Sequence, residues 1–309
     1  NAIAVTSDED QDPADNSAST TTQVVDARNG SYSVFSADGK PYTLSVDFDK
    51  LQYNVTGSGV SLARNFTFDP ATGDYVVGGN VRFRTATDML VGGDDFGGGV
   101  LPYLAARKFA TTVSAIAGAY DLATRNVPAT GAAATHAGTA LVSGNTLSVC
   151  QSDGAPVVPV RSCAADSRTD YLDLSVSGNV FTVVTSGGDV YKFSVAQSGA
   201  LKILLSAGPA RDGSQQLRVG PVDSSGGFTF GPPTYGPSSS GDWLTITLAN
   251  AGGTTRYTAI GSSMSMSDSA DLQTINAGAG PFSMLVGTSL LYSADIYVIQ
   301  ASPLVVVVG

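Results

Sequence analysis

Aspartates are the most plentiful ionisable side chains in this sequence, and they stand beside a single glutamate. Asp47 and Asp49 would share one face of a continuous strand, because successive side chains point to opposite faces. Asp170 and Asp173 form a second close pair. A glycoside hydrolase needs two carboxyl groups at a set separation, one of them with a raised pKa. An Asp-dependent glycoside hydrolase therefore stays open as an alternative, although turn-forming aspartates are common enough here to produce such pairs by coincidence.

Nucleophilic catalysis has little support in this chain. The Gly-x-Ser-x-Gly elbow of many hydrolases is absent. The one histidine, His136, lies in the small-residue stretch 132–138, which predicts a loop. A catalytic histidine needs a rigid setting and an orienting acid. We therefore expect no catalytic residue and a protein that is not an enzyme.

Asp94 and Asp95 are the candidate metal ligands, because they lie in the glycine-rich segment 92–99 and carboxylate and carbonyl oxygens suit calcium. The acidic segment 8–12 has the alternating aspartates that open an EF-hand loop. Pro13 and Ser19, however, occupy the positions that such a loop gives to Gly and Glu. We expect no cofactor, with a looser calcium site at Asp94 and Asp95 as the alternative.

Three aromatic residues, Trp243, Tyr235 and Tyr257, are candidate ligand contacts, because aromatic rings stack on sugars and small apolar ligands. Trp243 alternates with Thr245 and Thr247 along its expected strand, which predicts an exposed position on the less apolar face. A carbohydrate- or small-ligand-binding module is therefore the first alternative function, with a glycan as its partner.

The two cysteines, Cys150 and Cys163, flank the turn signal Asp153-Gly154-Ala155-Pro156. Two strand ends joined by such a loop can bring their Cα atoms within bridging distance, so we expect a disulfide. A disulfide indicates an oxidising compartment. No signal peptide is present, and the expectation of a secreted or cell-surface protein rests on these cysteines and on the Ser/Thr/Gly-rich composition.

Charge and composition exclude other classes of partner. The 309 residues are 14% charged, with a net charge of −10. Nucleic-acid binders need a basic surface, so we expect no nucleic acid as partner. No apolar run approaches the roughly 18 residues that a membrane-spanning helix needs.

The elements that position these residues are predicted to be mainly β-strands. The sequence Gly-Asn followed by alternating apolar residues recurs at Gly79-Asn80, Gly144-Asn145 and Gly178-Asn179. Gly and Asn suit tight hairpins, and period-two alternation is typical of half-buried strands. The fold class is therefore all-β, with antiparallel sandwich or barrel modules and at most one short helix, placed at 101–110.

The chain divides by composition into three parts. Residues 1–27 form a polar N-terminal arm, 28–112 a first β module and 113–309 a second. The apolar strands Ala2–Val5 and Leu304–Val308 need a partner, and we expect an exposed sheet edge to supply it. The favoured function is thus structural assembly or adhesion through β-edge pairing, with a second copy or another surface protein as partner.

Overall fold

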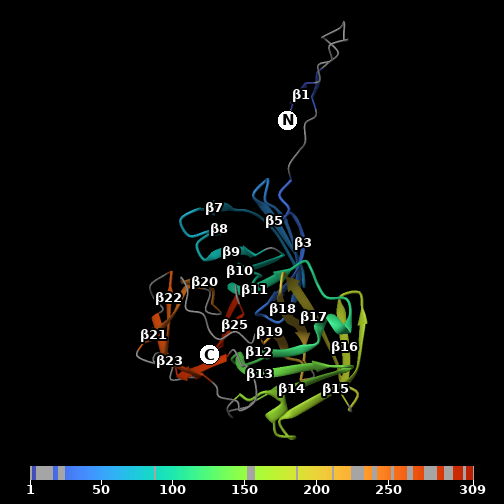
Figure 1. The fold of residues 1–309 in the computed structure, drawn as a ribbon. Coiled ribbons are helices and arrows are strands. Elements are labelled where there is room, and N and C mark those ends of the chain that lie inside the picture. The colour runs from blue at the N-terminus through green and yellow to red at the C-terminus, as the bar shows by residue number, and fades with distance from the viewer. Residues whose placement is uncertain are drawn as a thin grey trace.

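The structure is a computed structural model that describes residues 2–4, 17–19, 25–86, 88–151, 157–185, 187–210, 212–223, 233–238, 242–251, 254–262, 267–274, 284–288, 295–301 and 304–308. Within these ranges the protein is nearly all β, and its sheets are antiparallel (Figure 1). Two short 3-10 segments, η1 (Val113–Ile116) and η2 (Val160–Ser162), are the helical elements of the described chain. The predicted all-β class is confirmed.

The first sheet has nine strands and curls until its ends approach each other. Its strands are β3 (Gly30–Ser36), β4 (Pro41–Asp47), β5 (Gln52–Gly57), β6 (Val60–Asn65), β7 (Thr67–Asp69), β8 (Asp74–Gly78), β9 (Val81–Ala86), β10 (Met89–Asp95) and β11 (Val100–Ala106). The order β6-β5-β4-β3-β11-β10-β9-β8-β7 puts two consecutive strands at opposite ends. Aromatic side chains, Phe48, Phe66 and Phe83 among them, fill the inside of the curl.

The second unit is a closed eight-stranded barrel in which each strand pairs with the next. Its strands are β12 (Gly118–Val127), β13 (Ala134–Ser143), β14 (Thr146–Gln151), β15 (Arg168–Ser177), β16 (Val180–Thr185), β17 (Val190–Ser198), β18 (Leu201–Pro209) and β19 (Gln215–Pro221). Barrels of this size are just wide enough to be filled by side chains. Leu147, Phe181 and Val195 belong to the cluster that fills this one.

The third sheet has seven strands, β20 (Thr234–Pro237), β21 (Trp243–Ala251), β22 (Thr254–Gly261), β23 (Ser267–Thr274), β24 (Met284–Thr288), β25 (Asp295–Ala301) and β26 (Leu304–Val308). β26 pairs with β25, and Val306 packs against Ala123 and Ala137 of the barrel. The expectation that Leu304–Val308 is paired is therefore confirmed. The partner is a strand of the same chain.

The N-terminal strand has a different partner from the one expected. β1 (Ala2–Ala4) pairs with β2 (Ser17–Ser19) as a separate hairpin. Figure 1 shows β1 away from the sheets. Within the chain, residues 2–4 therefore do not extend any of the three sheets, and their pairing with a sheet edge of another copy stays a prediction.

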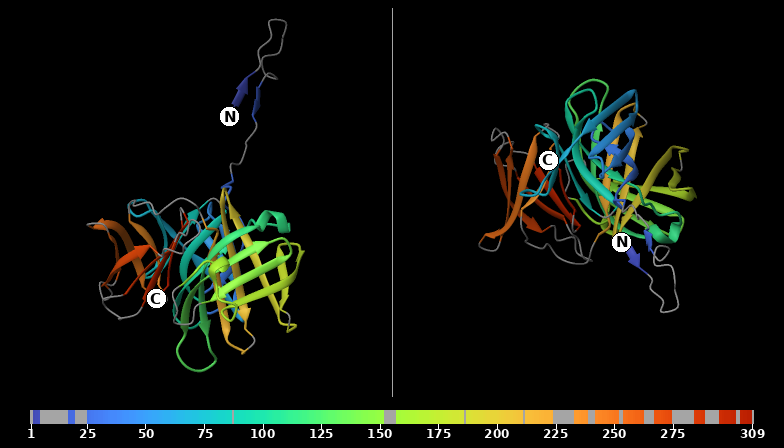
Figure 2. Two further views of the ribbon diagram at one scale, coloured as in Figure 1. Left: turned by 60° about the horizontal axis from the view of Figure 1, so that its bottom comes forward. Right: turned by 90° about the horizontal axis from the view of Figure 1, so that it is seen from above.

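The three units are packed against one another (Figure 2). Met89, Leu104 and Ala106 of the nine-stranded sheet form an apolar cluster with Ala196, Ile203 and Leu205 on the outside of the barrel. β20 lies against β9, β10 and β11. The first predicted module thus holds the nine-stranded sheet, and the second holds both the barrel and the seven-stranded sheet.

The three Gly-Asn signals are confirmed as two-residue hairpin loops. Gly79, Gly144 and Gly178 have φ values of 55°, 56° and 62°, a region that glycine enters without steric cost. In each case the flanking residues pair directly, as Ser143 does with Thr146. The alternation that follows each loop sends every second side chain into a core.

The predicted helix at 101–110 is wrong, because residues 100–106 form β11. Tyr103 and Ala105 face the aromatic core of the nine-stranded sheet, while Leu104 and Ala106 face the barrel. A strand buried on both faces is apolar throughout, and such a run cannot be told from a buried helix by periodicity.

The predicted disulfide is confirmed. Cys150 of β14 is bonded to Cys163, which follows η2, with their Cα atoms 6.0 Å apart. The bridge is typical of proteins that fold in an oxidising compartment. In the described part of the chain, no helix is long and apolar enough to span a membrane.

Candidate functional site

Asp94 and Asp95, the predicted metal ligands, are the last two residues of β10, and their carboxylates bind different partners. The buried carboxylate of Asp94 accepts a hydrogen bond from the Tyr53 hydroxyl at 2.6 Å and lies 3.2 Å from Nε of Arg64. Burial raises the pKa of Asp94. Asp95 accepts the backbone N–H groups of residues 97–99, which lowers its pKa. Among the described residues no group of three or more His, Cys, Asp or Glu side chains could hold a metal, and the calcium site stays a prediction.

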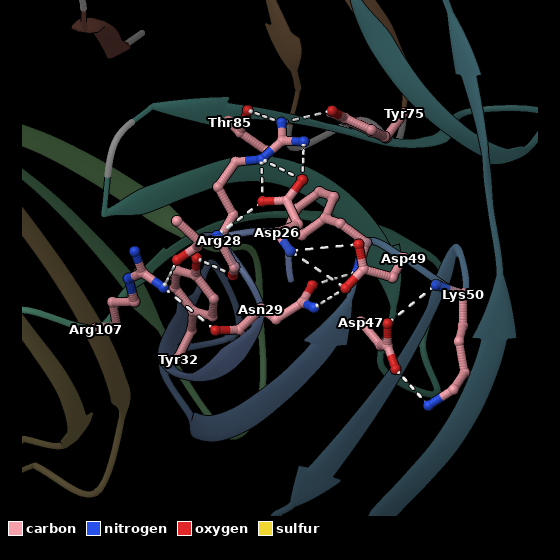
Figure 3. A network of polar contacts seen from close by, with 12 residues as sticks. Asp26, Arg28, Asn29, Tyr32, Asp47, Asp49, Lys50, Tyr75, Thr85 and Arg107 are labelled. Carbon is pink, nitrogen blue, oxygen red and sulfur yellow. Dashed lines mark hydrogen bonds and ion pairs between the residues drawn. The ribbon is translucent and has the colours of Figure 1, made fainter. Parts of the chain in front are cut away.

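The paired aspartates of the sequence are also separately engaged. Asp47 accepts a hydrogen bond from Nζ of Lys50 at 2.7 Å, and Asp49 accepts one from Nδ2 of Asn29 at 2.7 Å (Figure 3). Each carboxylate therefore holds a turn or a neighbouring segment in place.

Asp170 and Asp173, the second pair of aspartates, also lie in different local settings. Asp170 binds Nη2 of Arg168 at 2.7 Å and the Ser148 hydroxyl at 2.5 Å. Asp173 has a φ of 54° at the bulge in β15. The hydrolase hypothesis stays untested, and these contacts add nothing to it.

His136 is not in a loop, as its small neighbours predicted, but in β13. It is half-buried and lies opposite Thr124 of β12. Small residues are compatible with a strand here because both faces are packed: Ala140 lies in the barrel core, and Ala137 packs on the outside with Val157 and Ile299.

The three aromatic candidates do not form an exposed platform. The prediction that Trp243 is exposed is wrong: its side chain is 3% exposed, and Tyr257 is buried as well. Tyr235 is half-buried beneath the guanidinium group of Arg84, 4.1 Å from its ring centroid. β20 lies against β9–β11. The nine-stranded sheet therefore covers the face of this end of the seven-stranded sheet that the alternation of Trp243 with threonines predicted to be exposed. Ligand contact by these residues stays a prediction.

A polar clasp at residues 26–29 was not anticipated from the sequence (Figure 3). Arg28 donates from Nε and Nη2 to the carboxylate of Asp26 and from Nη1 to the Tyr75 hydroxyl at 2.6 Å. Its guanidinium group also lies 4.3 Å from the ring centroid of Phe48. The hydrogen bond from Arg28 lowers the pKa of Asp26 to about 2. Arg107 donates to the backbone oxygen of Ala27 at 2.8 Å. The clasp fixes the point at which the chain joins the nine-stranded sheet.

The outer wall of the barrel carries an exposed apolar surface on three neighbouring strands. Of the eight large hydrophobic side chains exposed in the described chain, Leu172, Val180 and Val190 lie on the outer face of β15–β17. Val176 of β15 is exposed as well, but it pairs with Phe181 of the barrel core and therefore faces inward. Leu172 pairs with Val184, which pairs with Val190, so these three form one outward row. We call Leu172, Val180, Val184, Val190 and the exposed Lys192 the β15–β17 face.

A cleft of about 350 Å³ continues this face. It lies between β3–β5 of the nine-stranded sheet and β16–β18 of the barrel, and Val180 and Lys192 belong to its wall. Tyr42, Thr43 and Ser194 add polar groups. Clefts between packed units are frequent binding sites, and Lys192 is the charged residue in the mixed polar and apolar lining of this one.

No protein-family model, curated protein or solved structure matches this chain.

Proposed function

We propose that this chain is a non-catalytic secreted or cell-surface protein that acts in assembly or adhesion by offering β surfaces to a partner. The observation that carries the proposal is the β15–β17 face. Scattered apolar residues are normal on protein surfaces, whereas contiguous apolar patches mark contact sites. Val190 is 59% and Leu172 47% exposed, and the register joins them through Val184.

The partner we favour is a second copy or another surface protein, because the face spans three neighbouring strands on the outside of the barrel. A protein partner would cover the apolar row, and an acidic group on it would meet Lys192. No ion pair within the described part of the chain includes Lys192. The cleft beside the face would receive a projecting side chain or loop of the partner.

Strand pairing at a sheet edge supports the same proposal. β6 and β7, the end strands of the nine-stranded sheet, each pair with one neighbour among the described strands. Edge strands can add a strand from another chain by main-chain hydrogen bonds. β7 has three residues, and its Phe68 is 50% exposed, so β6 is the longer template.

The test is the oligomeric state of the wild type and of Val190→Lys, measured by sedimentation velocity over a hundredfold range of concentration. We expect the wild type to associate and the variant to remain a monomer, because the lysine would have to be desolvated in the contact. Ile260→Lys is the matched control, since Ile260 is 48% exposed on β22 of the seven-stranded sheet. A wild type that stays monomeric excludes self-assembly, and a glycan array then tests the ligand-binding alternative.

A further inference from the structure

The barrel has two different ends. At one end the strands are joined by the two-residue loops 144–145 and 178–179, and η1 leads directly into β12. At the other end the connections are longer and include 128–133 and 152–167. We call these the closed end and the polar end.

Arg218 lies inside the barrel near the polar end. It pairs with Ser206 of β18 and Thr124 of β12, and Ser206 is two residues from Leu204, which belongs to the barrel core. Side chains two positions apart share a face, so Arg218 points inward. Its guanidinium carbon lies 4.8 Å from the ring centroid of Tyr191, a residue that also packs on the core.

The charge of Arg218 has no acidic partner. The side chain is 7% exposed, and no ion pair among the described residues includes it. Its Nε–H has no hydrogen-bond acceptor in the structure. Desolvation lowers the pKa of Arg218, but the phenol groups of Tyr191 and Tyr171 raise it by a larger amount. The net shift is upward, so the group stays charged. A buried cation without an anion is costly, and an anion that binds beside it would recover much of that cost.

A second buried polar atom lies at the same place. The Tyr191 hydroxyl is buried and makes no hydrogen bond of good geometry, although it lies near enough to Arg218 to raise the pKa of the guanidinium group. The rings of Tyr171 and Tyr191 are 5.6 Å apart and tilted by 41°. Tyr171, Tyr191 and His136, which all lie toward the polar end, are each partly exposed.

We propose that Arg218 and Tyr191 bind the carboxylate of a small organic acid that enters the barrel from its polar end. The guanidinium fork matches the two oxygens of a carboxylate, and the phenol O–H supplies a further donor. The aromatic rings of Tyr171 and Tyr191 would contact the organic part of the ligand. The net charge of −10 gives anions no long-range attraction, so binding depends on this local arrangement.

The experiment measures the binding of sodium benzoate to the full chain by calorimetry and by the rise in Tm. Sodium acetate, phosphate and chloride at equal ionic strength are the comparison salts. We expect benzoate to raise the Tm by about 2 °C at ten times its Kd, with acetate weaker and chloride without effect. Phosphate as the tightest ligand would overturn the assignment to carboxylates.

Three variants locate the site. Arg218→Met should abolish benzoate binding, and Tyr191→Phe should weaken it about tenfold. Arg256→Met is the control, because Arg256 is an exposed arginine on β22 that pairs with Asp271, and it should bind as the wild type does.

The proposal is wrong if benzoate leaves the wild type unchanged or binds Arg218→Met equally well. Should Arg218→Met not fold, Tyr191→Phe decides the matter, since it removes only the hydroxyl and leaves the ring that packs on the barrel core. Undiminished binding to that variant overturns the site. None of these outcomes depends on the β15–β17 face, so they are separate from the test of assembly.

Discussion

The closed and polar ends of the barrel are built from the same eight strands, yet they differ in whether the buried polar atoms inside them have hydrogen-bond partners. At the closed end Ile116, Tyr120 and Phe181 are fully buried, and the Tyr120 hydroxyl donates to the backbone oxygen of Ile116 at 2.6 Å. At the polar end Arg218 and Tyr191 hold buried polar atoms without partners. Natural proteins usually satisfy such atoms, and exceptions concentrate at functional sites. On the proposal made above, the closed end provides stability and the polar end binds the ligand.

The largest effect should come from emptying the closed end. Phe181→Ala removes a ring that is fully buried and stacked on Phe193 at 5.4 Å between centroids. We expect a loss of about 3–5 kcal/mol in the free energy of unfolding, measured by urea denaturation. Val180→Ala, one residue away and 37% exposed, should cost less than about 1 kcal/mol. Equal losses in the two variants would contradict a packed closed end.

The next effect concerns the covalent bridge at the polar end. The Cys150–Cys163 disulfide joins two residues 13 positions apart in the sequence and closes part of the long connection between β14 and β15. Replacing both cysteines by alanine should lower the free energy of unfolding by about 2–4 kcal/mol. The wild type in reductant should match the variant. Unfolding curves that coincide with and without the bridge would show that this loop needs no constraint.

Two tyrosines compare the ends directly. Tyr120→Phe leaves the backbone oxygen of Ile116 without its donor, and we expect a cost of about 1–2 kcal/mol. Tyr191→Phe removes a buried hydroxyl that has no partner, so stability should stay the same or rise slightly. Paired thermal melts give both values. A destabilised Tyr191→Phe would mean that its hydroxyl already has a partner in solution.

The last stability prediction concerns Arg218 itself. In a buffer free of carboxylates, Arg218→Met should unfold within about 1 kcal/mol of the wild type or be more stable, because an unpaired buried charge is replaced by an apolar chain. Equilibrium unfolding in chloride buffer measures this. A loss above about 3 kcal/mol would show that the arginine is compensated in the free protein and serves the fold.

Several features of the fold could be predicted from the residues because they depend on neighbours in sequence. The two-residue loop at Gly144-Asn145 follows from local backbone preference, and the Cys150–Cys163 bridge closes across a short loop. β11 and Trp243 were assigned wrongly because other units cover them. The packing of the barrel on β11, and of β20 on β9–β11, joins segments that are distant in sequence.

The candidate sites could not be predicted from the sequence, because they too join segments that are distant in the chain. The polar clasp joins Arg28 to Tyr75, and the β15–β17 face needs the register of three strands. An arginine within a run of alternating residues was the one local signal for Arg218. Alternation alone would have placed the Arg218 side chain on the solvent-exposed face of its strand.

The sequence by itself determined an all-β chain, its tight hairpins and its disulfide, because turn chemistry, alternation and a short loop act over a few residues. Tertiary structure decided which face of each strand is the inside. In β19, Val219 packs outward against the nine-stranded sheet, while Arg218 points into the barrel. A barrel that is covered by another sheet has two buried faces, and alternation cannot distinguish them.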